Sequence, residues 1–225
     1  MLLPDRRQFL KAATATVGGV ALAEFISSSA IRADAPPITA VGVRKEVNSL
    51  AADRPELNDY RKAVRVMKEW SAADANNPKG WTAQARIHLN HCPHGNWFFL
   101  PWHRAYLWYF EDICKEACGN ENFRLPYWNW TTNPRIPEQF LQSGSPLLHP
   151  RDVGANDTTD PGAIGQQVMD EIQGIPDFET FASGRSTEQR PGPNINGQLE
   201  GQAHNYIHVW IGRDMITLMS PLDPI

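Results

Sequence analysis

The chain is poor in features that mark several large classes of protein. It has three cysteines in 225 residues, a net charge of −4, and no apolar run long enough to span a bilayer comfortably. Nothing in this weakly acidic composition indicates a nucleic-acid surface. An odd number of cysteines leaves at least one outside any intramolecular disulfide. Hydrophobic residues make up 41% of the chain, which is enough for one sizeable domain, and no internal repeat is present.

The first 35 residues have the pattern of an export signal. Two arginines in "DRRQFLK" precede a mild apolar run, "AATATVGGVALA" at 12–23, and an "ADA" sequence of the kind that signal peptidases cleave. A membrane anchor is the alternative, but the run is short and Glu24 follows it. We therefore expect a twin-arginine signal at 1–35, an exported (periplasmic or secreted) product, and one domain at 36–225 without a membrane span.

Hydrophobic periodicity predicts a mainly α-helical fold with long loops. Asp53 can cap a first helix whose apolar face is expected to hold Leu57, Tyr60, Val64 and Met67. Further helices are expected over 81–88, 100–118 and 197–212, with Gly119 ending the third. Residues 132–195 are rich in proline and glycine, and we expect a long excursion with one short helix near 164–174.

Four of the seven histidines lie in one short aromatic window, "IHLNHCPHGNWFFLPWHR" at 87–104. Either each imidazole is satisfied separately in a core, or several of them hold one metal ion. A second group, "HNYIH", places His204 and His208 four residues apart, so that both rings share one face of a helix. Such a pair alone is weak support for a metal site, because chance or core packing produces it often.

The residues around these histidines favour copper over zinc. A zinc peptidase needs the sequence H-E-x-x-H, and here Asn205 and Tyr206 occupy the central positions without a general base. A structural zinc site would recruit more cysteines than Cys92 alone. Imidazole-only sites suit copper, and two histidine clusters suggest two facing ions that together reduce O2.

Two segments resemble the copper motifs of the tyrosinase, catechol oxidase and haemocyanin family. These are "HCPHGNWFFLPWHRAYLWYFE" at 91–111 and "GQLEGQAHNYIHVWIG" at 197–212, and "LPYWNW" at 125–130 resembles a family segment between them. The resemblance implies a four-helix bundle around a type-3 pair of copper ions that binds O2. It also implies that the sequence after "DPI" continues into a histidine-bearing fourth helix. We expect a truncated sequence or, alternatively, a divergent second site.

The resemblance assigns ligands residue by residue. His94 and His103 match the second and third ligands of the first copper, and His204 and His208 match the first two ligands of the second. His88 is the preferred first ligand, because it lies on a predicted helix, whereas the rival His91 is expected in the following loop. The third ligand of the second copper has no counterpart. The family pattern further implies a thioether between Cys92 and the His94 ring.

Other polar residues receive weaker assignments. The family pattern implies that Glu200 and Asn205 hold a water molecule that helps to deprotonate a phenol. Glu200 is equally well explained as an exposed glutamate in the first turn of a helix. Cys114 and Cys118 are four residues apart on a helix, an awkward geometry for a disulfide, and are expected as reduced core residues. Arg104 and Glu111 are expected in salt bridges, and His149 is expected in a loop without a partner.

The resemblance implies a copper oxidoreductase that converts phenols or o-diphenols to o-quinones with O2. An O2 carrier or copper-binding protein of the haemocyanin type is one alternative, and an o-aminophenol oxidase is another. With five matched ligands rather than six, the chain is not expected to be a competent oxidase by itself. The expected partner is a small phenolic molecule, and neither the substrate nor the oligomeric state follows from the sequence.

Overall fold

The computed structural model describes residues 42–51, 53–186, 188–191 and 195–225, and Gly42–Ile225 forms one compact unit. The predicted export signal lies outside these residues. The described part is mainly helical, as predicted, and contains no β-strand, only isolated bridges from Glu46 to Tyr127 and from Ser183 to Asn196. No helix in this part combines the length and the apolar character that crossing a bilayer requires.

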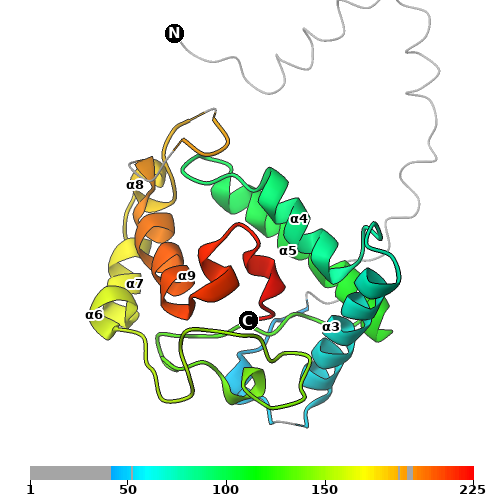
Figure 1. Cartoon of the computed structure of the whole chain (residues 1–225). Coiled ribbons are helices and arrows are strands. Elements are labelled where there is room, and N and C mark those ends of the chain that lie inside the picture. Colours follow the sequence, from blue (N-terminus) through cyan, green and yellow to red (C-terminus); the bar gives the residue numbers. More distant parts are fainter. Residues whose placement is uncertain (1–41, 52, 187, 192–194) are drawn as a thin grey trace, which may run out of the picture. The chain divides into compact units, whose positions relative to one another are not determined.

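Three long helices form one side of the fold: α3 (Pro55–Ala73), α4 (Trp81–His91) and α5 (Phe99–Cys118). Helix α3 packs against both α4 and α5 (Figure 1). The predicted apolar face of α3 is confirmed, because Leu57, Tyr60, Val64 and Met67 are all buried. Helix α5 contributes Phe110, Cys114 and Ala117 to the same core. Cys114 and Cys118 are both free and buried, as expected.

The ends of these helices differ in two places from the sequence prediction. Arg54, not Asp53, is the N-cap of α3 and makes no side-chain capping bond, so the predicted cap is wrong by one residue. Helix α4 continues to His91, three residues beyond the predicted end, and stops where Cys92 becomes extended before Pro93. Helix α5 ends as predicted at Gly119, whose φ of 74° is left-handed.

The predicted excursion contains several short helices instead of one. These are η3 (Glu138–Phe140), α6 (Pro161–Ile164), α7 (Gln166–Gln173) and α8 (Phe178–Phe181). The second histidine pair then lies on a continuous helical segment that begins as a π-helix, η5 (Leu199–His204), and continues as α9 (Asn205–Ile211). Two short 3-10 helices, η6 (Arg213–Ile216) and η7 (Ser220–Leu222), follow.

The segment after α9 connects the two histidine-bearing regions. Helix η6 contacts α9, and η7 contacts α4, so the last residues lie between these helices (Figure 1). Side chains from the core hold this segment by its backbone: the Tyr60 hydroxyl donates to Pro224 O at 2.6 Å, and Trp81 Nε1 donates to Leu222 O at 3.1 Å. The excursion adds a buried ion pair between Arg151 and Asp223.

Candidate metal centre

His88 is directed into the molecule by the buried face of α4. Trp81, Gln84 and Ala85 form this face together with His88, whose exposed fraction is 5%. The ring atom Nδ1 lies 2.8 Å from Leu218 O. Because a carbonyl oxygen only accepts hydrogen bonds, Nδ1 carries the proton and Nε2 keeps its lone pair. His91, at the end of the same helix, is exposed.

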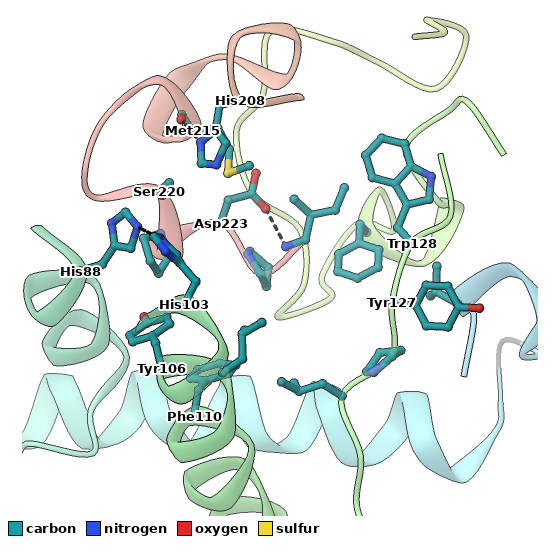
Figure 2. Close-up of a pocket in the computed structure, with 18 of the residues that line it drawn as sticks. His88, His103, Tyr106, Phe110, Tyr127, Trp128, His208, Met215, Ser220 and Asp223 are labelled. Atoms are coloured by element: carbon teal, nitrogen blue, oxygen red, sulfur yellow. Dashed lines mark hydrogen bonds between the residues drawn. The ribbon is translucent and has the colours of Figure 1, made fainter. Parts of the chain in front are cut away.

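His103 faces His88 from helix α5 and is oriented in the same way. Its Nδ1 atom lies 2.7 Å from Phe99 O, a carbonyl one turn earlier on its own helix, so its Nε2 atom is also unprotonated in the neutral ring. The two Nε2 atoms lie only 3.3 Å apart (Figure 2). Two lone pairs at this distance repel each other unless a cation lies between them. Two metal–nitrogen bonds of about 2.0 Å would accommodate this separation.

His94 completes the first group from the irregular loop between α4 and α5. Its ring centroid lies 5.7 Å from that of His88 and 5.3 Å from that of His103. The loop is held by its backbone, since His94 N donates to Gln189 O at 3.0 Å and Gly95 N donates to the Glu200 carboxylate. The structure therefore brings together the three residues predicted for the first copper.

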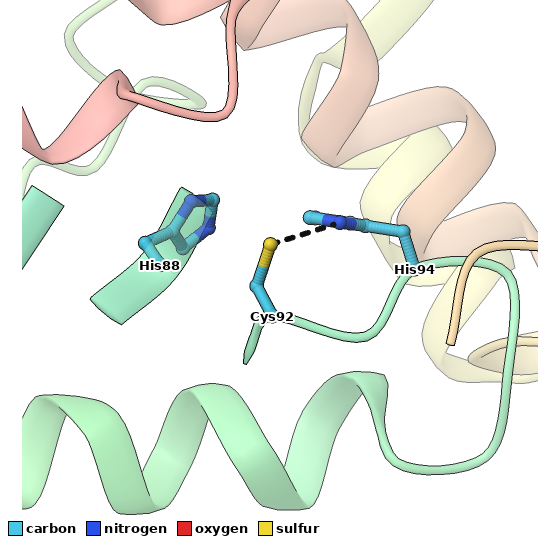
Figure 3. A group of neighbouring side chains, drawn as sticks. All are labelled: His88, Cys92 and His94. Atoms are coloured by element: carbon cyan, nitrogen blue, oxygen red, sulfur yellow. Dashed lines mark hydrogen bonds between the residues drawn. The ribbon is translucent and has the colours of Figure 1, made fainter. Parts of the chain in front are cut away.

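Cys92 lies inside this group. Its Sγ atom is 3.5 Å from His94 Nδ1, and the ligand atoms of His88, Cys92 and His94 all lie within 4.8 Å of one another (Figure 3). Burial raises the pKa of the Cys92 thiol, although the nearby Arg190 guanidinium opposes this shift. The sulfur is therefore placed both to react with the His94 ring and to approach a metal ion directly.

His204 and His208 form the second group on the helical segment η5–α9. Their ring centroids are 4.3 Å apart, and the His204 centroid is 5.5 Å from that of His94. His204 Nδ1 lies 2.9 Å from Asn205 Oδ1, and His208 Nδ1 lies 2.5 Å from Met215 O. Both Nε2 atoms are thus left for other ligands, as in the first group. Among the described residues, no imidazole outside the first group joins this pair.

Burial keeps the five imidazoles neutral. Desolvation is the largest cause of the lowered pKa at each ring, and neighbouring imidazoles add to it at every ring except that of His208. The pKa falls to about 3 for His94 and His204, to about 4 for His103, and below its usual value for His88 and His208. Neutral imidazole is the form that binds a metal, so protons do not compete for these nitrogens near neutral pH.

Two cavities adjoin the histidines. One, of about 300 Å³, is lined by four of them and by aromatic residues that include Tyr106, Phe110 and Trp128 (Figure 2). The other, of about 600 Å³, reaches His94 as well and is lined by Arg190, Asn205 and Thr217 together with the exposed side chains of Val209 and Ile216. A small organic molecule can therefore approach the imidazoles through the second cavity.

Glu200 lies in the interior of the fold, not on its surface. Its side chain is fully buried, so the interpretation as an exposed first-turn glutamate is wrong. Its carboxylate accepts from Gly95 N at 2.8 and 3.0 Å and from the Ser183 hydroxyl. Burial raises its pKa, and these hydrogen bonds oppose the shift. Glu200 thus ties η5 to the loop that carries His94.

Two other predictions for polar residues need correction. His149 is not without a partner, because its Nε2 atom lies 2.8 Å from the Asp214 carboxylate. Glu111 pairs with Arg44 at 3.0 Å as expected, but Arg104 forms no ion pair with any described residue. Sequence reasoning also missed the segment at 188–190 that holds the His94 loop, because nothing in its composition distinguishes it from other surface loops.

The chain is similar to known proteins. Residues 65–170 match the family model described as the common central domain of tyrosinase. The chain is 26% identical over 215 residues to the chloroplastic polyphenol oxidase of Spinacia oleracea, covering 75% of this chain and 33% of that protein. It is 29% identical over 211 residues to chloroplastic catechol oxidase B of Solanum tuberosum, covering 79% and 35%.

The fold is shared with solved structures as well. The match to the structure of latent apple tyrosinase covers 86% of this chain and 50% of the apple protein chain, with a TM-score of 0.69 and 24% sequence identity. The chain spans about a third of the length of the curated relatives that it matches. Proteins of this family use a type-3 pair of copper ions with O2 as co-substrate. The chain therefore resembles the tyrosinase and catechol oxidase family in its central region and in its fold.

Proposed function

We propose that this chain forms the copper-binding core of an oxidase that converts phenols or o-diphenols to o-quinones with O2. His88, His94 and His103 would hold one copper ion, and His204 and His208 would hold the other. The observation that carries the proposal is the convergence of five neutral, buried imidazoles whose Nδ1 atoms face other partners. The His88 and His103 Nε2 atoms, 3.3 Å apart with no proton between them, fit a shared cation.

Copper bound at these residues would exchange electrons with O2 and with the phenolic ring. The residues of the chain prepare the site for this chemistry. Carbonyl oxygens of Leu218, Phe99 and Met215 hold the rings of His88, His103 and His208 in one tautomer. The centroid of the Phe99 ring lies 4.9 Å from the centroids of the His103 and His204 rings, so an apolar ring packs against both groups.

A proton-transfer role for Glu200 and Asn205 remains part of the proposal. Both residues line the larger cavity, through which a phenol would enter. The Glu200 carboxylate accepts three hydrogen bonds from Gly95 and Ser183, and a carboxylate has about four acceptor positions. One position is therefore left for a water molecule that accepts the phenol proton, while the Asn205 side chain orients His204.

The larger cavity favours an oxidase over the alternative of an O2 or copper carrier, because a carrier needs no space for an organic substrate beside its metal. An o-aminophenol oxidase would use the same space, so an activity assay must distinguish this alternative.

We also propose that residues 1–35 are a twin-arginine export signal. The relatives are themselves described as chloroplastic.

Copper binding by the purified full chain tests the proposal. We expect one firmly held copper ion and a second, weaker one, because His204 and His208 are not joined by a third imidazole. His103→Ala should lose the firm ion, and His149→Ala, which removes a histidine outside the centre, should not. Copper content after desalting measures this, and O2 uptake with 4-methylcatechol, a monophenol and o-aminophenol tests the substrate class. Equal copper loss in both variants would contradict the assignment.

A further inference from the structure

Arg190 makes unusual contacts for an arginine at the edge of a cavity. Its Nε atom donates to Cys92 O at 3.1 Å, and its Nη2 atom donates to Leu89 O at 2.6 Å. The same Nη2 atom lies 3.4 Å from Cys92 Sγ. No carboxylate among the described residues forms an ion pair with Arg190. Its guanidinium therefore acts on the end of α4 and on the Cys92 side chain instead of on an acidic partner.

The neighbouring Gln189 holds the same loop without touching the sulfur. Its backbone oxygen accepts from His94 N at 3.0 Å. Its side-chain Nε2 atom lies 3.1 Å from Asn90 O and 3.4 Å from Cys92 O. The two residues thus share the task of fixing the backbone, and only Arg190 reaches the thiol. This difference makes Gln189 a matched control for the contact to the sulfur.

The Cys92 sulfur is held between two groups. Arg190 Nη2 lies 3.4 Å from it, and His94 Nδ1 lies 3.5 Å from it. Of the two carbon atoms bonded to Nδ1, only Cε1 carries a hydrogen atom. A side chain in another χ1 rotamer would carry the sulfur away from this carbon. The contact with the guanidinium favours the rotamer in which the sulfur faces the ring.

We propose that Arg190 is the positioning residue for a thioether between Cys92 and His94. In this step the S–H bond of Cys92 and the Cε1–H bond of His94 break, and a carbon–sulfur bond forms. Two protons and two electrons pass to O2, which becomes hydrogen peroxide. The inference rests on the proposed function, which supplies copper and O2. The crosslink would fix the His94 ring, the one imidazole of the centre that lies on an irregular loop.

The experiment uses the full chain and four proteins: wild type, Arg190→Ala, Arg190→Lys and Gln189→Ala. Each is loaded with copper(II) in air, and its copper content, intact mass and crosslinked peptide are measured. The intact mass of the wild type should fall by the mass of two hydrogen atoms, and its digest should contain a peptide in which Cys92 is joined to His94. Arg190→Ala should keep its firmly held copper but form the crosslink several-fold less completely. Arg190→Lys should be intermediate, and Gln189→Ala should resemble wild type.

The crosslinked fraction and the copper content separate this role from a general effect on folding. The proposal is overturned if Arg190→Ala crosslinks as fully as wild type, or if Gln189→Ala loses as much crosslink as Arg190→Ala. Wild-type protein that keeps copper while Cys92 stays fully alkylatable would also overturn it, and the copper centre would still stand. Wild-type protein that holds no copper would instead refute the proposed function.

A readout without copper tests the contacts of Arg190 with the backbone of this segment. Hydrogen exchange of the backbone amides at 89–96 is compared between metal-free wild type and Arg190→Ala. Faster exchange in the variant, at an unchanged melting temperature, supports the positioning role. Unchanged exchange in this segment would show that Arg190 does not hold it, and the proposal would then fail whatever the copper content.

Discussion

At the scale of single residues, the candidate centre depends on the partners of the Nδ1 atoms as much as on the imidazoles. A ring with a free Nδ1 atom can adopt either tautomer and can turn away from its neighbours. Here carbonyl oxygens or a side-chain amide occupy Nδ1 of His88, His103, His204 and His208, and the Cys92 sulfur lies beside Nδ1 of His94. The ring nitrogens that can bind a metal are therefore already oriented by the fold.

The choice between His88 and His91 leads to the first prediction at this scale. His88 is buried with its Nε2 atom directed at His103, whereas His91 is exposed at the last position of α4. We expect His88→Ala to lose the firmly held copper ion and His91→Ala to retain it. Copper content measured side by side on the two variants decides the point. Loss of metal from His91→Ala alone would reverse the assignment.

The sequence predicts His91 in a loop, but His91 lies on the same helix as His88. Helical position alone therefore does not distinguish the two histidines. Burial and the direction of the ring separate them, and these depend on how α4 packs against α5 and on the Leu218 carbonyl. A contact between residues 130 positions apart cannot be predicted from local periodicity. The contacts of Arg190 and Gln189 with the end of α4 also join residues far apart in the sequence, so they could not be predicted either.

At the scale of secondary-structure elements, the regular helices followed from the sequence and the irregular ones did not. Helix α5 was predicted nearly to the residue, because a proline near its start and a glycine after its end mark both limits. Leu107 lies one turn before the buried residue Phe110 on this helix but is 41% exposed, because it lines the smaller cavity beside the centre instead of the core. A periodic pattern cannot distinguish a core from the wall of a cavity.

The π-helical start of the second histidine segment was also not predictable. The π-helix Leu199–His204 has a wider turn than an α-helix, and such turns are frequent at functional sites. It lets Glu200 reach the backbone of Gly95 while His204, four residues later, faces His94. The wider turn follows from these contacts across the centre, and the sequence 197–212 by itself fits an ordinary α-helix equally well.

The left-handed end of α5 gives a prediction at the element scale. Gly119 has a φ of 74°, so a Cβ atom there is strained even though its nearest neighbour, Lys62 Nζ, would be 3.7 Å away. We expect Gly119→Ala to lower the free energy of unfolding by about 1 kcal/mol. Gly174 ends α7 with a φ of −76°, so Gly174→Ala should be neutral or slightly stabilising. Urea unfolding of both variants measures the difference, and equal effects would refute the conformational explanation.

At the scale of the whole molecule, the histidine groups face each other because distant segments hold the last residues in place. The backbone after α9 supplies carbonyl partners to His88 and His208 and then passes beside α4. Tyr60 from α3 and Trp81 from α4 donate to its carbonyl oxygens, and Arg151 from the excursion binds Asp223. Loosening this segment would therefore disturb the centre as well as the core.

The Arg151–Asp223 pair leads to the last prediction. Nε and Nη2 of Arg151 lie 2.8 and 2.5 Å from the two oxygens of Asp223, and each side chain is only 1% exposed. Removing one partner of a buried pair leaves an uncompensated charge, so Asp223→Asn should lower the free energy of unfolding by about 3–5 kcal/mol. The Arg65–Glu69 pair, with side chains 55% and 58% exposed, is the control, and Glu69→Gln should cost less than about 1 kcal/mol. Urea unfolding followed by tryptophan fluorescence compares the two, and a loss as small in Asp223→Asn as in Glu69→Gln would mean that the buried pair does not anchor the segment.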